Sequence, residues 1–241
     1  MSATSNKTWL ASVLTVLPEM FPGPLGISLS GKALAEQKWS LQTIDIRKFS
    51  TTRYGSVDDT PAGGGPGMVM RADILGSAID SVERDGRPMI LLSPRGVPLT
   101  QARSRALAQG PGVVLLCGRY EGIDERLIEA RGLEEISLGD FVLSGGEIAA
   151  MALIDSCVRL LAGVVGDDQS LEEESFEDGL LEYPHYTRPP VWEGREIPSV
   201  LMSGHHERIR AWRHERSIEI TKARRPDMWD AYLKRVPKTK H

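Results

Sequence analysis

The sequence has few cysteines, few aromatic residues and no long uncharged apolar run. Its 241 residues include 2 cysteines, and aromatic residues make up 6% of the chain. Cys117 and Cys157 lie inside apolar runs and form neither a disulfide framework nor a set of metal ligands, so we expect buried free thiols in a reducing cytoplasm. Because no stretch of about 18 uncharged apolar residues occurs, no membrane-spanning helix is expected. The 41% hydrophobic content supports a core, and we expect a soluble, cytoplasmic protein.

Motifs for metal binding, a nucleophile elbow and a Walker-type phosphate loop are also missing, and no metal ligands are assigned. The apolar stretch from Trp9 to Leu17 follows a single Lys7 and precedes no convincing cleavage site, which favours a first strand over a signal peptide. Four glycines between residues 63 and 67 could cradle a phosphate, but no Lys-Ser/Thr pair follows them. A mobile connecting loop is the ordinary interpretation of such a segment.

Charge is distributed unevenly along the chain. The net charge is −4, yet residues 204–241 hold 11 Lys and Arg against 5 Asp and Glu, a net charge of +6. Residues 167–182 hold 8 acidic residues and no basic one, which is typical of a solvated linker. We therefore predict a domain over residues 1–166, an acidic linker over 167–182 and a C-terminal domain over 183–241.

In the first domain, strands and helices alternate, as expected of a mostly parallel α/β sheet. The segment VVLLC, residues 113–117, is apolar on both faces, as a central parallel strand covered by helices on each side requires. Ser144 and Glu147 predict a capping box, and Gly163 predicts the end of the same helix. The predicted strands are 9–17, 41–49, 88–92, 112–117 and one within 134–143; the predicted helices are 32–38, 70–83, 100–109, 123–131 and 145–161.

A helical pattern after residue 195 predicts a small all-α C-terminal domain, with Ile209, Trp212, Ile218 and Trp229 facing inward. Arginines alternate with these positions. They either face water on an amphipathic helical subdomain or form a basic surface that contacts RNA.

Two turn-rich segments follow predicted strands: GRYEGIDERL, residues 118–127, and SLGDFVLSGGE, residues 137–147. Glycine allows the backbone to turn sharply or to approach a ligand closely. Crevices form at the carboxyl ends of parallel strands. The two segments together predict one ligand pocket, although either one alone could simply connect two elements.

With these segments the chain resembles the bacterial tRNA (guanine-N1)-methyltransferases of the TrmD family, whose second motif usually reads SIGDYVLSGGE. The resemblance extends over roughly residues 10–230. It implies transfer of a methyl group from S-adenosylmethionine to N1 of guanosine 37 in tRNA, which supports reading-frame maintenance, by a homodimer with its active site at the interface. Further blocks follow in family order: DDTPAGGGPGM (58–68), LLSPRG (91–96), LLEYPHYTRPPVWEG (180–194), SGHHERIRAWR (203–213) and ARRPD (223–227).

The resemblance implies a SPOUT fold, in which a mostly parallel α/β sheet carries a deep trefoil knot. Knots contradict ordinary topology rules, so this expectation depends on the family alone. Loops of the knot would hold S-adenosylmethionine in a bent shape, with Gly139 and Gly145 at close backbone range and apolar side chains against the adenine ring. The expected cofactor-binding residues are Leu92, Ser93, Pro94, Gly118, Tyr120, Glu121, Gly122, Ser137, Leu138, Gly139, Asp140, Phe141, Val142, Leu143, Gly145 and Gly146.

Two positions match catalytic residues of the family. Arg159 matches the catalytic arginine, although its spacing from Asp155 is equally that of a structural i, i+4 ion pair. The family's general base is an Asp in a D-S-F triplet, and this chain has Glu174-Ser175-Phe176. We therefore expect Glu174 to be the base, with Glu173 as the alternative. Mg²⁺ can assist in the family, but no motif here locates it.

The resemblance also implies contacts with tRNA by Gly64, Glu182, His205, Arg208 and Arg213. Two other functions stay open from the sequence. A knotted methyltransferase could modify a different RNA base or position, and a non-catalytic RNA-binding protein could keep the pocket but lose its base through the change from Asp to Glu.

Overall fold

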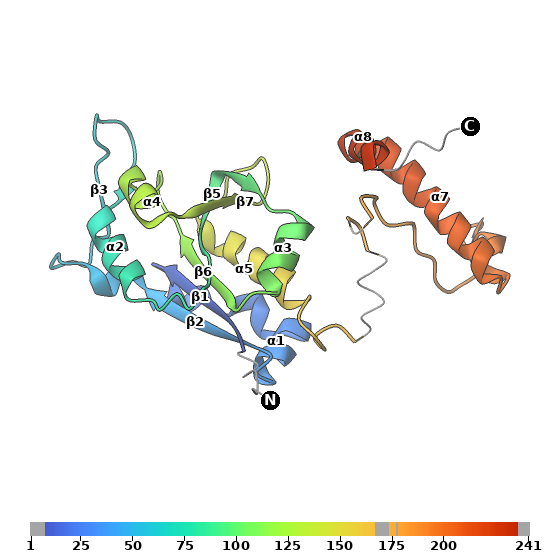
Figure 1. Ribbon diagram of the computed structural model, residues 1–241, viewed down its shortest axis with the longest axis horizontal. Coiled ribbons are helices and arrows are strands. Elements are labelled where there is room, and N and C mark those ends of the chain that lie inside the picture. Colours follow the sequence, from blue (N-terminus) through green and yellow to red (C-terminus); the bar gives the residue numbers. More distant parts are fainter. Residues whose placement is uncertain (1–7, 167–173, 177, 236–241) are drawn as a thin grey trace. The chain divides into compact units, whose positions relative to one another are not determined.

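The computed structural model describes residues 8–166, 174–176 and 178–235 (Figure 1). The chain forms two compact units, Met1–Gly166 and Asp167–His241. We call them the sheet unit and the C-terminal unit. The division between them falls at the first residue of the acidic block.

A five-stranded sheet forms the centre of the sheet unit (Figure 1). The strand order is β2-β1-β6-β5-β7, and each neighbouring pair is parallel. The predicted class, an α/β fold with a parallel sheet, is therefore confirmed, whereas the trefoil knot stays a prediction. The strands are β1 (Trp9–Thr15), β2 (Trp39–Asp45), β5 (Met89–Pro98), β6 (Gly112–Cys117) and β7 (Glu134–Ser137).

Helices cover both faces of this sheet, as the apolar strand 112–117 predicted. Side chains of β6 alternate between two cores: Val113 and Leu115 pack into one core with α5, and Val114 and Leu116 pack into the other with α2. Every residue of β6 is buried. One face is covered by α1 (Ser28–Ala35), α3 (Gln101–Ala108) and α5 (Gly146–Val158), and the other by α2 (Ala72–Asp80) and α4 (Glu125–Arg131) (Figure 1).

The predicted helix 145–161 begins within one residue of the expected position, as α5 starts at Gly146, but its predicted cap and its predicted end were wrong. Its N-cap is Gly145 and no side chain caps it. The capping box fails because the carboxylate of Glu147 binds Thr15 and Arg119 instead of the helix end. The helix stops at Val158, so Gly163 lies in a turn beyond the helix and does not close it.

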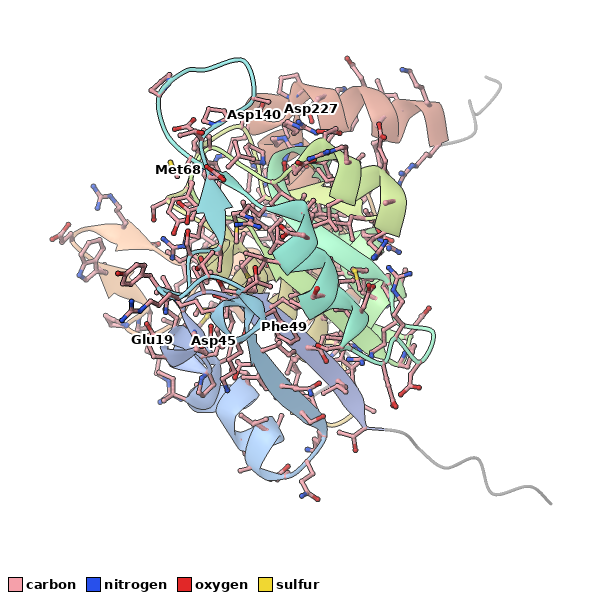
Figure 2. All side chains as sticks on the ribbon, turned by 90° about the vertical axis from the view of Figure 1, so that its left-hand side faces the viewer. Glu19, Asp45, Phe49, Met68, Asp140 and Asp227 are labelled. Carbon is pink, nitrogen blue, oxygen red and sulfur yellow. The ribbon has the colours of Figure 1, made fainter. Side chains whose placement is uncertain are left out.

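Shorter elements surround the sheet. The predicted strand 41–49 ends at Asp45 and continues as the 3₁₀ turn η3 (Ile46–Phe49), where the Asp45 side chain accepts from the N–H of Arg47. A long loop separates β3 (Asp58–Asp59) from β4 (Val69–Met70), which pair antiparallel, and Met68 at the end of this loop is labelled in Figure 2. Two further 3₁₀ turns are η1 (Pro18–Met20) and η2 (Gly23–Gly26).

The C-terminal unit is helical but not all-α, so that part of the prediction was wrong. A hairpin pairs β8 (Val191–Trp192) with β9 (Arg195–Glu196) across a two-residue turn, in which Glu193 and Gly194 have φ of 48° and 74°. The helical elements are η4 (Ser199–Met202), α7 (His206–Arg224) and α8 (Pro226–Arg235). None of the helices in the described ranges is both long and apolar enough to span a bilayer.

Polar residues of α7 connect this helix to the segment around Leu181. Ser217 and Thr221 are buried, whereas the four side chains predicted to face inward are half-buried. The Thr221 hydroxyl donates to the Ser217 carbonyl at 2.7 Å and accepts from the N–H of Leu181 at 2.8 Å. This contact joins residues 40 positions apart within the C-terminal unit.

Candidate functional site

A cavity of about 330 Å³ lies at the carboxyl ends of β6 and β7 and beside the middle of β5. Its walls come mainly from segments 91–95, 118–123 and 135–146. Parallel strands place their carboxyl ends at one edge of a sheet, which is where open α/β proteins bind ligands. The volume is in the range of small-molecule sites, roughly 300 to 1,000 Å³.

The cavity brings together all but two of the residues expected to bind the cofactor. Gly139 and Asp140 do not line it. Gly139 has φ of 156°, and an added Cβ would lie 3.0 Å from the Phe141 ring, so this glycine makes room for Phe141. Asp140 lies in the loop between β7 and α5 and is labelled in Figure 2. The residues that do line the cavity are Leu92, Ser93, Pro94, Gly118, Tyr120, Glu121, Gly122, Ser137, Leu138, Phe141, Val142, Leu143, Gly145 and Gly146.

Apolar side chains form both the wall and the rim of this cavity. Leu138 and Leu143 pack against the buried core. Tyr120, Phe141 and Val142 are more than half exposed, at 55%, 55% and 84%. The wall is therefore held in place by the core, and the rim leaves apolar surface for a ligand or a partner to cover.

An irregularity in β5 supplies the segment 93–95. The register of β5 against β7 shifts between Leu92 and Val97, so the intervening residues leave the ladder. An added Cβ on Gly96 would overlap the backbone of Glu135, so only glycine lets this bulge pack on β7. Arg95, at the end of the bulge, pairs with Glu125 at 2.7 Å and with Glu135 at 3.4 Å. The hydrogen bond that Arg95 donates to Glu125, and then the negative charge of Glu135, raise the pKa of the Arg95 guanidinium.

The long glycine-rich loop before β4 is attached to the segment 118–122. The N–H of Glu121 donates to the Met68 carbonyl at 3.0 Å. Gly67 has φ of 81°, and an added Cβ there would overlap the Glu121 carboxylate. Gly64, the expected tRNA contact in this loop, is exposed and has no atom within 4 Å of an added Cβ.

Arg119 and Glu147 were missed by the sequence analysis. Arg119 lines the cavity, and its Nη2 lies 2.9 Å from Oε2 of Glu147, a residue with no exposed surface. The Thr15 hydroxyl donates to the other oxygen of Glu147 at 2.7 Å. A signal was present, since Glu147 is a charged residue at the start of a mostly apolar helix and Arg119 lies in the first motif.

The two expected catalytic residues belong to different units. Arg159 is the C-cap of α5 in the sheet unit, is half-buried, and its N–H donates to the Asp155 carbonyl at 3.1 Å. Glu174 belongs to the C-terminal unit. The alternative base, Glu173, lies outside the described residues.

Within the C-terminal unit, Glu174 lines a cavity of about 210 Å³ together with the expected tRNA contacts Glu182 and Arg213. The N–H of Glu182 donates to the Ser175 hydroxyl at 2.9 Å. The Glu182 carboxylate lies 2.9 Å from Nε2 of His185. The triplet that carries the expected base is therefore linked to Glu182 within this unit.

Cations lie over aromatic rings along α7 and α8. The Arg213 guanidinium lies 4.6 Å from the centroid of Tyr183, and the Lys222 amine lies 4.5 Å from that of Trp229. The other expected tRNA contacts, His205 at the N-cap of α7 and Arg208 in its first turns, are exposed. No group of three or more His, Cys, Asp or Glu side chains in the described part of the chain could hold a metal ion.

A parallel α/β sheet with one cavity walled by three segments is the arrangement that open α/β domains use for small molecules, and here it is followed in the chain by a C-terminal unit with a basic tail. The family model described as tRNA (Guanine-1)-methyltransferase TrmD matches residues 10–231. The chain belongs to this family.

Relatives at high identity cover nearly the whole chain. It is 64% identical over 224 residues to the tRNA (guanine-N(1)-)-methyltransferase of Brucella ovis, covering 93% of this chain and 92% of that protein. The protein of the same name from Brucella melitensis biotype 1 gives the same identity and coverage. That from Brucella suis is also 64% identical, over 93% of this chain and 91% of its own length.

Proposed function

We propose that this protein transfers a methyl group from S-adenosylmethionine to N1 of guanosine 37 in tRNA. One observation carries the proposal. In a chain of the tRNA (guanine-1)-methyltransferase family, both turn-rich motifs and the bulge of β5 meet around one cavity, beside the carboxyl ends of the parallel strands β6 and β7.

The residues around the cavity fit this cofactor. Leu138 and Leu143, held by the core, offer flat apolar surface to an adenine ring, and Gly118 and Gly122 leave the backbone open to its polar edges. The cofactor supplies an electrophilic methyl group on a positively charged sulfur.

Glu174 and Arg159 have complementary roles in the proposal. The Glu174 carboxylate accepts the N1 proton of guanine, which leaves an electron pair on N1 and negative charge on O6. This pair forms the bond to the methyl carbon, and the electrons of the broken sulfur–carbon bond return to sulfur, which leaves S-adenosylhomocysteine. Arg159 donates to O6, and loss of such a donor typically costs about 2.7 to 4 kcal/mol of transition-state stabilisation.

A homodimer is part of the proposal. One copy supplies the cavity and Arg159, and the other supplies Glu174 and its basic C-terminal residues, which hold the tRNA backbone. We also propose that the sheet unit carries the trefoil knot of the family. The proposed location is the cytoplasm, where tRNA is available. We also propose that Mg²⁺ assists the methyl transfer, and we assign no structural role to it.

Transfer of labelled methyl groups tests this function. The full-length protein should label a tRNA transcript that carries G37, and digestion followed by mass spectrometry should locate 1-methylguanosine at that nucleotide. A transcript with A37 is the matched control and should stay unlabelled. Label at another base would favour a different RNA methyltransferase, and tRNA binding without any transfer would favour a non-catalytic RNA-binding protein. Repeating the assay in EDTA tests the contribution of Mg²⁺.

A further inference from the structure

Arg119 and Glu147 form an ion pair beneath the cavity of the sheet unit. The distance from Nη2 to Oε2 is 2.9 Å, and the side chains are 20% and 1% exposed. The other carboxylate oxygen of Glu147 accepts a hydrogen bond from Thr15 at the end of β1, 132 residues away in sequence. The pair therefore fixes the first turn of α5 to the sheet.

Arg119 also joins the two motif segments that surround the cavity. It belongs to the segment 118–122, and its Nη1 donates to the Ser144 carbonyl in the segment 137–146 at 3.1 Å. The N–H of Gly146 donates to the Gly118 carbonyl at 2.9 Å. The guanidinium thus extends from one segment to the backbone of the other, with the carboxylate of Glu147 behind it.

Gly145 provides the space through which the arginine passes. An added Cβ on Gly145 would overlap Nε of Arg119. Gly145 has φ of 173°, an extended conformation that any residue can adopt. Its expected close approach to the ligand stays a prediction, whereas the side chain that an added Cβ would meet is that of Arg119.

A contribution to folding stability does not by itself explain why Arg119 and Glu147 are buried together. A buried ion pair can often be replaced by apolar residues of similar volume without loss of stability. An apolar replacement could not donate to the Ser144 carbonyl, so directional control of the loop is what the arginine adds. Preformed sites bind more tightly because less ordering is needed on binding.

We propose that Arg119 is a positioning residue for the cofactor site: anchored by Glu147, it fixes the backbone from Ser144 to Gly146 against the segment 118–122. The inference depends on the proposed binding of S-adenosylmethionine in this cavity. Glycine is required at position 145 because the arginine passes there.

Calorimetric titration of the full-length protein with S-adenosylmethionine tests the inference. Arg119→Ala should weaken binding at least tenfold, because the loop loses its anchor and Glu147 loses its partner. Arg119→Lys keeps the charge but not the planar fork, so it should give an intermediate loss. Arg126→Ala is the matched control, since this exposed arginine pairs with Asp124 away from the cavity and should bind as the wild type does.

A double-mutant cycle separates positioning from simple stability. Gly145→Ala should weaken binding in the wild-type background but add less than threefold in the Arg119→Ala background, where no long side chain passes the glycine. Thermal unfolding without ligand measures stability separately.

Different results would contradict the proposed function and the positioning role of Arg119. Wild-type protein that binds no S-adenosylmethionine would overturn the proposed function and this inference with it. Wild-type binding together with an Arg119→Lys variant of unchanged affinity, or with fully additive effects in the cycle, would overturn the inference alone.

Discussion

Gly146 and Cys117 approach each other so closely that only glycine fits at the start of α5. A Cβ built on Gly146 would lie 2.8 Å from the Cα of Cys117 and 3.1 Å from the backbone nitrogen of Gly118. Both obstructing atoms belong to the backbone at the end of β6, so neither can move aside as a flexible side chain could. This close contact between α5 and β6 also fixes the position of the segment 137–146 at the wall of the cavity.

Gly146→Ala should therefore lower the free energy of unfolding by about 1 to 3 kcal/mol, the usual cost of overpacking a buried site. Because the helix start must shift, affinity for S-adenosylmethionine should fall as well. Urea denaturation measures the first effect and calorimetry the second. Gly166→Ala is the control, since no atom lies within 4 Å of an added Cβ there. An alanine variant with wild-type stability would mean that the contact is looser than described.

The buried cysteines predict a loss of stability at high pH. Burial raises the pKa of the Cys157 thiol from its ordinary value of 9.0 to about 12, and burial raises that of Cys117 well above its ordinary value. The folded state therefore binds more protons than the unfolded state between these values. The stability that comes from the buried Cys157 thiol is complete below pH 9 and falls as pH rises toward 12, by up to about 1.4 kcal/mol per pH unit, and burial of Cys117 acts in the same direction.

Denaturation midpoints at pH 8 and pH 10 check this expectation. Cys157→Ala should show a smaller decrease between the two pH values than the wild type. Thiol reagents should label neither cysteine in the folded protein at pH 8 and both in denaturant. Rapid labelling of folded protein would contradict the burial of both thiols.

Salt dependence tests the role of α7 in tRNA binding. Arg208 is exposed in the first turns of this helix, where a phosphate contact would be electrostatic. Arg208→Ala should weaken tRNA binding and reduce the slope of log affinity against log salt by about one. Arg47→Ala, which removes an exposed arginine in η3 of the sheet unit, is the comparison and should leave the slope unchanged. Equal slopes for the Arg208 variant and wild type would show that Arg208 makes no contact with the RNA.

The sequence predicted the sheet unit well where local pattern and burial agree. The predicted strand 112–117 matched β6 because every position is buried, as the continuous hydrophobic run indicates. The hairpin β8–β9 was missed although its Glu-Gly turn flanked by short extended segments was a usable signal. Strand order could not be derived, since no local pattern states that β6 lies between β1 and β5.

Tertiary contacts explain why the candidate site was only partly predictable. Glu147 matched a capping box by spacing, but its carboxylate binds Thr15 and Arg119, which local sequence cannot show. The motif positions that line the cavity came from a resemblance to a family and not from a physical derivation. Gly139 makes room for the Phe141 ring, a packing contact that the motif alone does not show.

Substitution of Glu174 tests the proposed base directly. Glu174→Gln keeps the size and hydrogen bonding of the side chain but removes its basicity. Turnover should therefore fall by about 10²- to 10⁴-fold, the usual contribution of general base catalysis, while both substrates still bind. Glu174→Asp should retain measurable activity, because it restores a carboxylate of the family type at the cost of a small shift of the backbone. Single-turnover methylation at saturating tRNA is the measurement, since it separates chemistry from product release.

Two neighbouring carboxylates make the test of Glu174 specific. Asp178 lines the same cavity of the C-terminal unit, so Asp178→Asn changes the local charge equally and should leave turnover within about threefold of wild type. If Glu174→Gln were the variant that stayed within this range, Glu174 could not be the base. Loss of activity in Glu173→Gln instead would assign proton removal to the adjacent residue, because the match to the D-S-F triplet would be wrong by one position while the need for a carboxylate would remain.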